Sequence, residues 1–215
     1  MEPYKLPLCA AEAEFTEKKS RFIGHITPAS SENEALTFLR SIRERRREAT
    51  HNVYAYRIIG RADSRVDGGV CRHSDDGEPS GTAGMPLLDV FIKQGVYDFC
   101  CVATRYFGGV KLGAGGLVRA YARCGALALE ASGIGVMSKI TLCATTLPYA
   151  VYEPLKRLMS LFGAEVISED FEALVELKFS LLSENLPAFQ SRFIELTAGK
   201  SIINIEGTRM SAVKI

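Results

Sequence analysis

The chain has 215 residues, enough for one large domain or two small ones. Hydrophobic residues make up 47% of it and charged residues 24%, which is typical of globular proteins and argues against both disorder and a membrane protein. Lysine and arginine (26) nearly balance aspartate and glutamate (25), so the composition excludes a protein that is basic over its whole surface.

The first 136 residues are expected to form a mixed α and β domain. Ser31 and Glu34 make a capping box in front of an apolar stripe, which predicts a helix. A nearly continuous apolar run from 96 to 104 predicts a buried strand. The other expected elements, in chain order, are strands near 14–15 and over 21–26, a strand over 52–59, a loop over 60–70, a helix that begins between Pro79 and Pro86, and a helix over 117–131.

Apolar spacing also predicts which side chains these helices bury. The expected core residues are Ala35, Phe38 or Leu39, and Ile42 of the first helix, then Leu87, Leu88, Phe91 and Ile92 of the second, and Ala120, Cys124, Leu127 and Ala131 of the third. The third helical pattern ends in a glycine-rich segment just before Val136, where we expect a domain boundary.

Residues 137–215 are expected to form a smaller second domain. The pattern predicts a strand over 137–147, a helix over 149–162, strands over 164–169 and 171–180, a helix over 186–198 and a strand over 201–206. This order, βαββαβ, is the ferredoxin-like arrangement, and the predicted fold class of the chain is therefore α+β.

A glycine-rich segment between the buried strand and the third helix is the strongest candidate for a binding site. Five of the 12 residues from Arg105 to Gly116 are glycines, which let a backbone approach a ligand closely. The start of the following helix favours an anion. The predicted anion-binding or nucleic-acid-binding residues are Arg105, Gly108, Gly109, Lys111, Gly113, Gly115, Gly116 and Arg119. The alternative is a structural turn, because the segment fits neither the Walker A pattern nor G-x-G-x-x-G.

An acidic cluster precedes this segment in the chain, with Asp75, Asp76 and Glu78 within four residues. One interpretation is a metal site or a general base. A second is a cap for the N-terminus of a helix, where carboxylates accept backbone N–H bonds. A third is that these acids pair with Arg105 or Lys111 and order the glycine-rich segment.

A basic run at 40–47 carries five arginines against Glu44 alone. It could contact a phosphate backbone, or it could be the solvated end of a helix whose dipole favours cations.

Elsewhere, the charges of neighbouring segments cancel. Residues 100–136 carry four basic side chains and one acidic one, whereas 60–92 carry three basic and six acidic ones. A basic site beside an acidic one is therefore compatible with the nearly neutral total.

The cysteines and histidines show no spacing typical of a metal site or a disulfide framework. We interpret the six cysteines as reduced core thiols of a cytoplasmic protein, and we expect neither a signal peptide nor a membrane segment. His51, directly before a strand, is expected to pack or to form a hydrogen bond. Neither a metal nor a cofactor is predicted.

Several stretches taken together resemble the IMPACT family, specifically its bacterial two-domain YigZ type. They are Lys19-Ser20-Arg21-Phe22-Ile23, residues 49–56, residues 74–84, residues 102–109 and Leu117-Val118-Arg119-Ala120-Tyr121. The resemblance implies an N-terminal domain similar to elongation factor G domain IV and to a domain of a ribosomal small-subunit protein. It also implies a ferredoxin-like C-terminal domain.

The functional implication of this resemblance is a regulatory binding protein associated with translation, since eukaryotic members regulate translational initiation through protein binding. Its partner would be RNA, a ribosome or a translation-related protein, and no DNA specificity is expected. The resemblance supplies no catalytic residues. Two alternatives remain open: a small-molecule phosphate enzyme that uses the 105–117 loop and the 75–78 carboxylates, and a pure protein-interaction adaptor.

Overall fold

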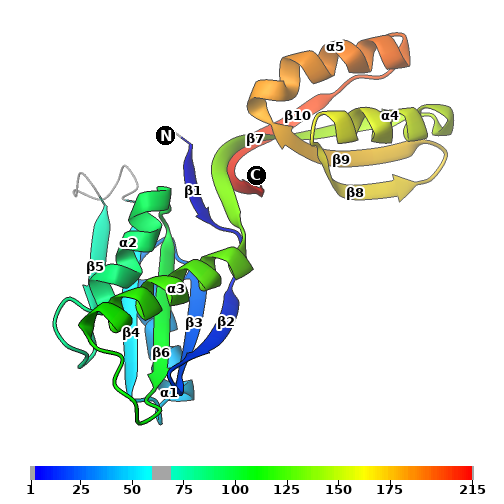
Figure 1. The fold of residues 1–215 in the computed structure, drawn as a ribbon. Coiled ribbons are helices and arrows are strands. Elements are labelled where there is room, and N and C mark those ends of the chain that lie inside the picture. Colours follow the sequence, from blue (N-terminus) through cyan, green and yellow to red (C-terminus); the bar gives the residue numbers. More distant parts are fainter. Residues whose placement is uncertain (1–2, 60–68, 215) are drawn as a thin grey trace. The chain divides into compact units, whose positions relative to one another are not determined.

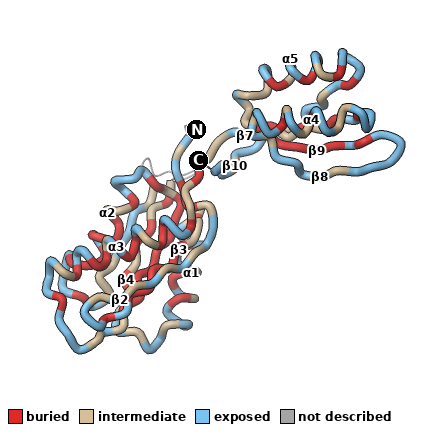
Figure 2. Tube along the Cα trace, turned by 45° about the vertical axis from the view of Figure 1, so that its right-hand side comes forward, coloured by how far each residue is buried: buried red, intermediate tan, exposed pale blue. Residues whose placement is uncertain are grey.

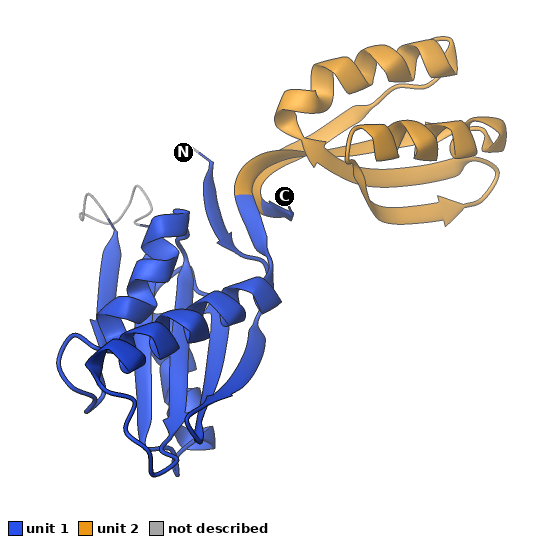
Figure 3. Cartoon of the chain, viewed as in Figure 1, with its two compact units in different colours: residues 1–136, 212–215 blue, residues 137–211 orange. Residues whose placement is uncertain are grey.

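A computed structural model of the protein describes residues 3–59 and 69–214. These form two compact units, Met1–Val136 with Ala212–Ile215 and Met137–Ser211 (Figure 3). The second unit therefore ends at Ser211, whereas the predicted second domain extends to residue 215. Residues 212–215 belong to the first unit. Most of the loop expected over 60–70 lies outside the described residues.

The first unit is built on a five-stranded antiparallel sheet with the strand order β2-β3-β6-β4-β5 (Figure 1). Its strands are β2 (Ala11–Glu17), β3 (Ser20–Pro28), β4 (His51–Ile58), β5 (Val70–Ser74) and β6 (Phe99–Tyr106). The edge strand β5 was not among the predicted elements. Its side chains are half-buried or exposed, so it shows no apolar alternation to detect.

Helices cover both faces of this sheet. Helix α1 (Glu32–Arg45) packs on one face, and α2 (Gly84–Gln94) and α3 (Ala114–Ser132) pack on the other (Figure 1). In the central strand, Cys101 and Ala103 face α2 and α3, whereas Cys100 and Val102 face α1. The apolar run of β6 is continuous because both faces of that strand are covered.

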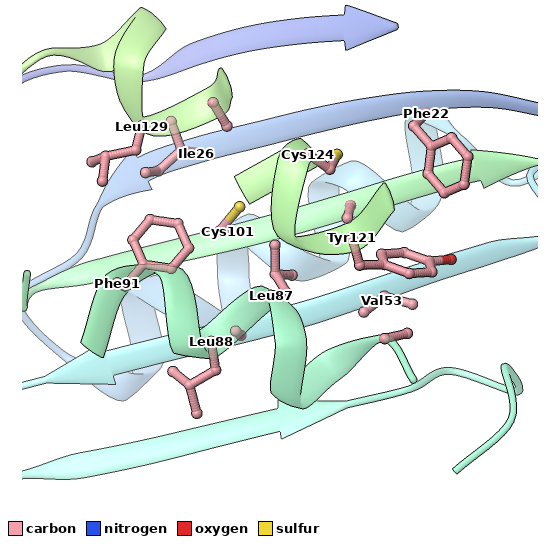
Figure 4. Close-up of a cluster of buried hydrophobic side chains, with 14 of the residues drawn as sticks. Phe22, Ile26, Val53, Leu87, Leu88, Phe91, Cys101, Tyr121, Cys124 and Leu129 are labelled. Carbon is pink, nitrogen blue, oxygen red and sulfur yellow. The ribbon is translucent and has the colours of Figure 1, made fainter. Parts of the chain in front are cut away.

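The larger core of the first unit lies between the sheet and the helices α2 and α3. Figure 4 shows Phe22, Leu87, Phe91 and Tyr121 gathered there, all of them fully buried. Along the chain, buried residues concentrate in the central strands and on the inner helix faces (Figure 2).

The predicted helix faces need two corrections. In α2, Ile92 is 41% exposed, because it lies at the outer edge of the buried stripe. In α3, Ala131 is exposed and Leu127 only half-buried. The buried face of α3 instead follows two i, i+4 rows, one through Leu117 and one through Ala120, so it turns away from those two positions. The remaining predicted core residues of α1 and α2 are buried, except that Phe38 is only half-buried.

The second unit has the ferredoxin-like fold. Its elements are β7 (Ile134–Leu147), α4 (Tyr149–Leu161), β8 (Glu165–Phe171), β9 (Val175–Leu182), the short 3₁₀ helix η1 (Ser183–Asn185), α5 (Leu186–Thr197) and β10 (Asn204–Lys214). The sheet order β10-β7-β9-β8 follows the predicted βαββαβ connectivity. Strand β10 begins and ends later than expected. A short N-terminal strand, β1 (Tyr4–Pro7), pairs with β7 and was not predicted.

All six cysteines lie in described residues and are free thiols. Cys100, Cys101, Cys124 and Cys143 are buried, but Cys9 and Cys71 are exposed, so the prediction of core thiols is wrong for these two. None of the described helices is long and apolar enough to cross a membrane.

Candidate anion-binding site

The glycine-rich segment connects the end of β6 to the start of α3 and rests on the turn between β2 and β3 (Figure 1). A Cβ at Gly108 would lie 2.0 Å from the backbone oxygen of Lys19, so no other residue fits there without moving one of the two backbones. Lys18 and Lys19 themselves have positive φ values of 44° and 65°. The contact therefore brings two turn lysines next to the glycine-rich segment.

The other glycines serve the backbone path and the helix start. Gly109 and Gly113 have φ values of 80° and 78°, a conformation that glycine adopts without strain. Helix α3 begins at Ala114, three residues earlier than expected, so Gly115 and Gly116 lie in its first turn. No side chain caps this helix, and its first turn contains no acidic residue. Its exposed N–H groups and the positive end of its dipole are therefore available to an anion.

Arg105 lies in the interior, whereas sequence reasoning placed it among the ligand-binding cations. Its Nη1 donates to Glu78 Oε1 at 2.7 Å, and its Nη2 donates to Ser20 Oγ at 3.2 Å. The hydroxyl of Tyr121 donates to the same Glu78 oxygen at 2.7 Å. Burial and this hydrogen bond raise the pKa of Tyr121, which keeps the hydroxyl protonated. Of the three interpretations of the acidic cluster, the pairing with Arg105 therefore holds for Glu78.

Asp75 caps helix α2 from outside the helix. Its carboxylate accepts hydrogen bonds from the N–H groups of Gly81, Ala83 and Gly84, at 2.8–3.0 Å. Partial burial alone would raise the pKa of Asp75, but these three bonds outweigh it and hold the pKa below its ordinary value. The cap interpretation therefore holds for Asp75.

Asp76 binds α1 and β4. One carboxylate oxygen accepts from Arg43 Nη2 at 2.7 Å and the other from the N–H of Asn52 at 2.7 Å. The backbone oxygen of Asp76 lies 2.9 Å from Nδ1 of His51, so the expected hydrogen bond of His51 is present. Among the described residues, no three histidine, cysteine, aspartate or glutamate side chains are arranged to hold a metal ion.

Five exposed cations lie in the turn between β2 and β3, in the glycine-rich segment and on the first half of α3, and we call them the basic face. They are Lys18, Lys19, Lys111, Arg119 and Arg123. None of them forms an ion pair with another described residue. A hollow of about 260 Å³ lies among them, lined by Phe15, Glu17, Lys18, Leu112, Gly116, Arg119, Ala120 and Arg123. The guanidinium of Arg123 sits 4.5 Å from the centre of the Phe15 ring.

A second concavity of about 380 Å³, which we call the α3 pocket, lies beside the start of the same helix. It is lined by Thr50, His51, Glu78, Pro79, Arg105, Phe107, Lys111, Leu112, Gly113, Ala114 and Leu117. Leu112, which follows the glycine turn, lines both concavities, whereas Lys111 lines the α3 pocket. The glycine-rich segment thus separates an open basic surface from a pocket with a buried ion pair in its wall.

Comparison with known proteins places this arrangement in a family. The Impact N-terminal domain matches residues 18–129, and a domain of unknown function (DUF1949) matches residues 145–200. The chain is 40% identical over 200 residues to the IMPACT family member YvyE of Bacillus subtilis, which covers 90% of this chain and 87% of that protein. The chain belongs to the IMPACT family.

Other IMPACT relatives match across both units. The family member YigZ of Escherichia coli is 31% identical over 202 residues, which covers 93% of this chain and 96% of that protein. A solved structure, described as the crystal structure of a hypothetical protein, has a TM-score of 0.59 and 28% identity, and covers 94% of this chain and 97% of its own. These matches support the bacterial two-domain type that the sequence motifs indicated.

In this IMPACT chain, the predicted site residues separate into two groups. Lys111 and Arg119 lie on the basic face, whereas Arg105 forms the buried ion pair. Sequence reasoning missed Lys18 and Lys19, although two lysines between two strand-like runs are a usable signal for an exposed turn. It also did not anticipate that Thr50 and His51 line a pocket with the glycine-rich segment, since only the β4–β6 pairing brings them together.

The basic run of α1 behaves differently from the basic face. Arg43 pairs with Asp76, and Arg46 pairs with Glu12 at 2.9 Å. Only Arg40, Arg45 and Arg47 remain exposed without an ion pair among the described residues.

Proposed function

We propose that this IMPACT-family protein is a translation-associated binding protein that contacts RNA, as part of the ribosome or free, through the basic face. The observation that carries the proposal is the cluster of five exposed cations without ion-pair partners in the described structure, beside a helix start that no side chain caps. Such a surface attracts phosphates regardless of base sequence. The role in translation rests on the family resemblance.

Aromatic side chains near these cations add a second kind of contact. Phe107 at the start of the glycine-rich segment is 47% exposed, whereas Phe15 is half-buried, stacks on Phe22 and lies beneath the guanidinium of Arg123. Exposed aromatic rings beside cations are typical of surfaces that hold single-stranded nucleic acid, because every base can stack on a ring. We therefore favour single-stranded RNA over a protein partner.

The enzyme alternative loses its proposed acidic ligands. Asp75 caps a helix, Asp76 binds Arg43 and the Asn52 N–H, and Glu78 binds Arg105 and Tyr121. Their carboxylates point to three different elements and do not converge on one position. This divergence speaks against a shared magnesium ion or a common base at 75–78.

Charge reversal tests the RNA contact. We would compare Lys111→Glu/Arg119→Glu/Arg123→Glu with Arg40→Glu/Arg45→Glu/Arg47→Glu, which changes the charge equally on α1 and just after it. Binding of an unstructured RNA oligonucleotide and sedimentation with ribosomes would be measured between about 50 and 200 mM salt. We expect the first variant to lose more than about tenfold in affinity, with a salt slope lower by about 2, and the control to change little.

The opposite results would refute this contact. If the wild-type protein neither binds RNA nor sediments with ribosomes at the lowest salt, the proposal fails. Equal loss in the two variants would show that only total charge matters. Capture of a translation-related protein that survives nuclease treatment, without RNA binding, would favour the adaptor alternative.

A further inference from the structure

The α3 pocket contains a buried cation with an unused donor. The side chain of Arg105, which lines the pocket, is 5% exposed. Two of its guanidinium nitrogens donate to Glu78 and Ser20, but Nε has no hydrogen-bond partner in the described structure. An unsatisfied buried donor is unfavourable, and more so when it is charged. Nε is enclosed by protein atoms, so Arg105 contributes its positive charge to the pocket wall and not a direct hydrogen bond to a ligand.

His51 presents a second unused nitrogen in the same wall. Its Nδ1 lies 2.9 Å from the backbone oxygen of Asp76, and a carbonyl oxygen only accepts, so Nδ1 carries the proton. Nε2 is then left facing Glu78, whose Oε1 is 3.8 Å away.

Further donors enter the α3 pocket from three other segments. The hydroxyl of Thr50 accepts the N–H of Phe107 at 3.0 Å, which leaves its own proton free to donate. Lys111 lines the pocket with an exposed ammonium group, and Ala114 lies there at the uncapped start of α3. These donors come from separate segments of the chain and line the same pocket.

The volume and the charge of the pocket limit the chemical class of ligand that it can bind. A volume of about 380 Å³ falls within the range of about 300–1,000 Å³ typical of small-molecule sites, and it suits one nucleotide-sized group better than a run of them. Glu78 would repel an anion if it stood alone, but Arg105 and Tyr121 both donate to it. Donors from several directions match the three terminal oxygens of a phosphomonoester better than a planar carboxylate.

We infer that the α3 pocket binds a phosphomonoester, namely the terminal phosphate of the RNA that the basic face contacts. The inference rests on the proposed function, because the same RNA would run from the basic face across the glycine-rich segment. The phosphate would lie against the start of α3, with Lys111 and Thr50 as donors and His51 in the adjoining wall. The protein would then distinguish RNA ends by their phosphorylation.

The test compares one RNA oligonucleotide with a 5′-phosphate, a 3′-phosphate or hydroxyl groups at both ends. We expect the wild-type protein to bind one phosphorylated form at least about tenfold more tightly than the unphosphorylated form. His51→Gln and Lys111→Met should reduce this preference to less than about threefold. His73→Gln, which changes an exposed histidine on β5, should retain it.

Inorganic phosphate alone separates this inference from the proposed function. We expect it to shift the backbone amide resonances of residues 114–116 in the wild-type protein but not in His51→Gln. Equal binding of phosphorylated and unphosphorylated RNA would overturn the inference and leave the RNA-binding proposal standing. Phosphate binding without any RNA binding would retain the pocket and refute the proposed function. Acetate that shifts the same resonances as strongly as phosphate would overturn the choice of a phosphomonoester.

Discussion

The acidic segment 75–78 and the basic segment 105–123 lie beside each other in the first unit, yet the protein uses their charges in opposite ways. Every carboxylate of the acidic segment has partners within the protein. Lys111, Arg119 and Arg123 have no ion-pair partners in the described structure, and only Arg105 of this segment is buried with one. The difference teaches that charge density does not identify a binding site. What identifies it is whether the fold supplies the opposite charge.

Backbone geometry explains the difference. The N–H of Glu78 donates to the oxygen of Asp75 at 3.0 Å, and Asp76 has a φ of 46°, so the acidic segment is a tight turn. A tight turn sends its three carboxylates in different directions, each toward a nearby element. In contrast, Arg119 and Arg123 are four residues apart on α3 and therefore share one face of that helix. The close approach of Gly108 to the backbone of Lys19 places the two turn lysines beside the glycine-rich segment, where they form part of the basic face.

The largest effect should follow from breaking the buried ion pair. Glu78→Gln leaves the charge of Arg105 uncompensated in the interior, and we expect it to lower the free energy of unfolding of the first unit by about 3–5 kcal/mol. Hydrogen exchange of the β6 amides during urea denaturation would measure this. Glu14→Gln breaks the exposed pair with Arg21 and should lower the free energy of unfolding far less, because solvent screens an exposed pair. Equal effects of the two variants would contradict the assignment of Glu78 to the fold.

A smaller, pH-dependent effect should follow from removing the cap of α2. Asp75→Ala leaves three backbone N–H groups without their acceptor, and we expect a loss of about 1–3 kcal/mol at neutral pH. The pKa of Asp75 is lower in the folded protein than its ordinary value of 3.8, so its contribution is complete above that value. This contribution to stability disappears as the pH falls through the lower pKa of the folded protein, because the carboxyl is then protonated in both the folded and the unfolded state.

The difference in stability between the Asp75→Ala variant and the wild-type protein should therefore shrink in acid. Urea denaturation at neutral pH and near pH 3 would measure it. Asp170→Ala, at an exposed position on β8, should change stability by less than about 0.5 kcal/mol. A difference that stays constant with pH would show that the ionised carboxylate is not the source of the stability.

Much of the fold could be predicted from local signals. The N–H of Glu34 donates to Ser31 Oγ at 3.3 Å, as the capping box requires, although the Glu34 carboxylate accepts from Ser30 and not from Ser31. The apolar run of β6 and the βαββαβ order of the second unit were equally readable. These features depend on residues close together in the chain, where hydrophobic periodicity and capping residues indicate the secondary structure.

The site itself depends on contacts between distant residues, and these leave little trace in one sequence. Glu78 and Arg105 are 27 positions apart, and both belonged to candidate sites of their own. Four strands and two helices lie between Lys19 and Gly108 in the chain. A glycine signals that a side chain would not fit or that the backbone is unusual, but it does not say which segment lies opposite.

The smallest effect on stability should come from the basic face, and it decides whether the two charged segments differ as argued. Lys111→Glu/Arg119→Glu changes the net charge by four units, yet both side chains are exposed and have no ion-pair partner in the described structure. We expect the free energy of unfolding to change by no more than about 0.5 kcal/mol per substitution, or even to rise at low salt, because the neighbouring like charges repel one another. Urea denaturation at low and high salt would measure this, beside RNA binding by the same samples. A loss of stability as large as that of Asp75→Ala would mean that these cations stabilise the fold. Their clustering would then no longer be explained by a basic surface that is kept free for a ligand.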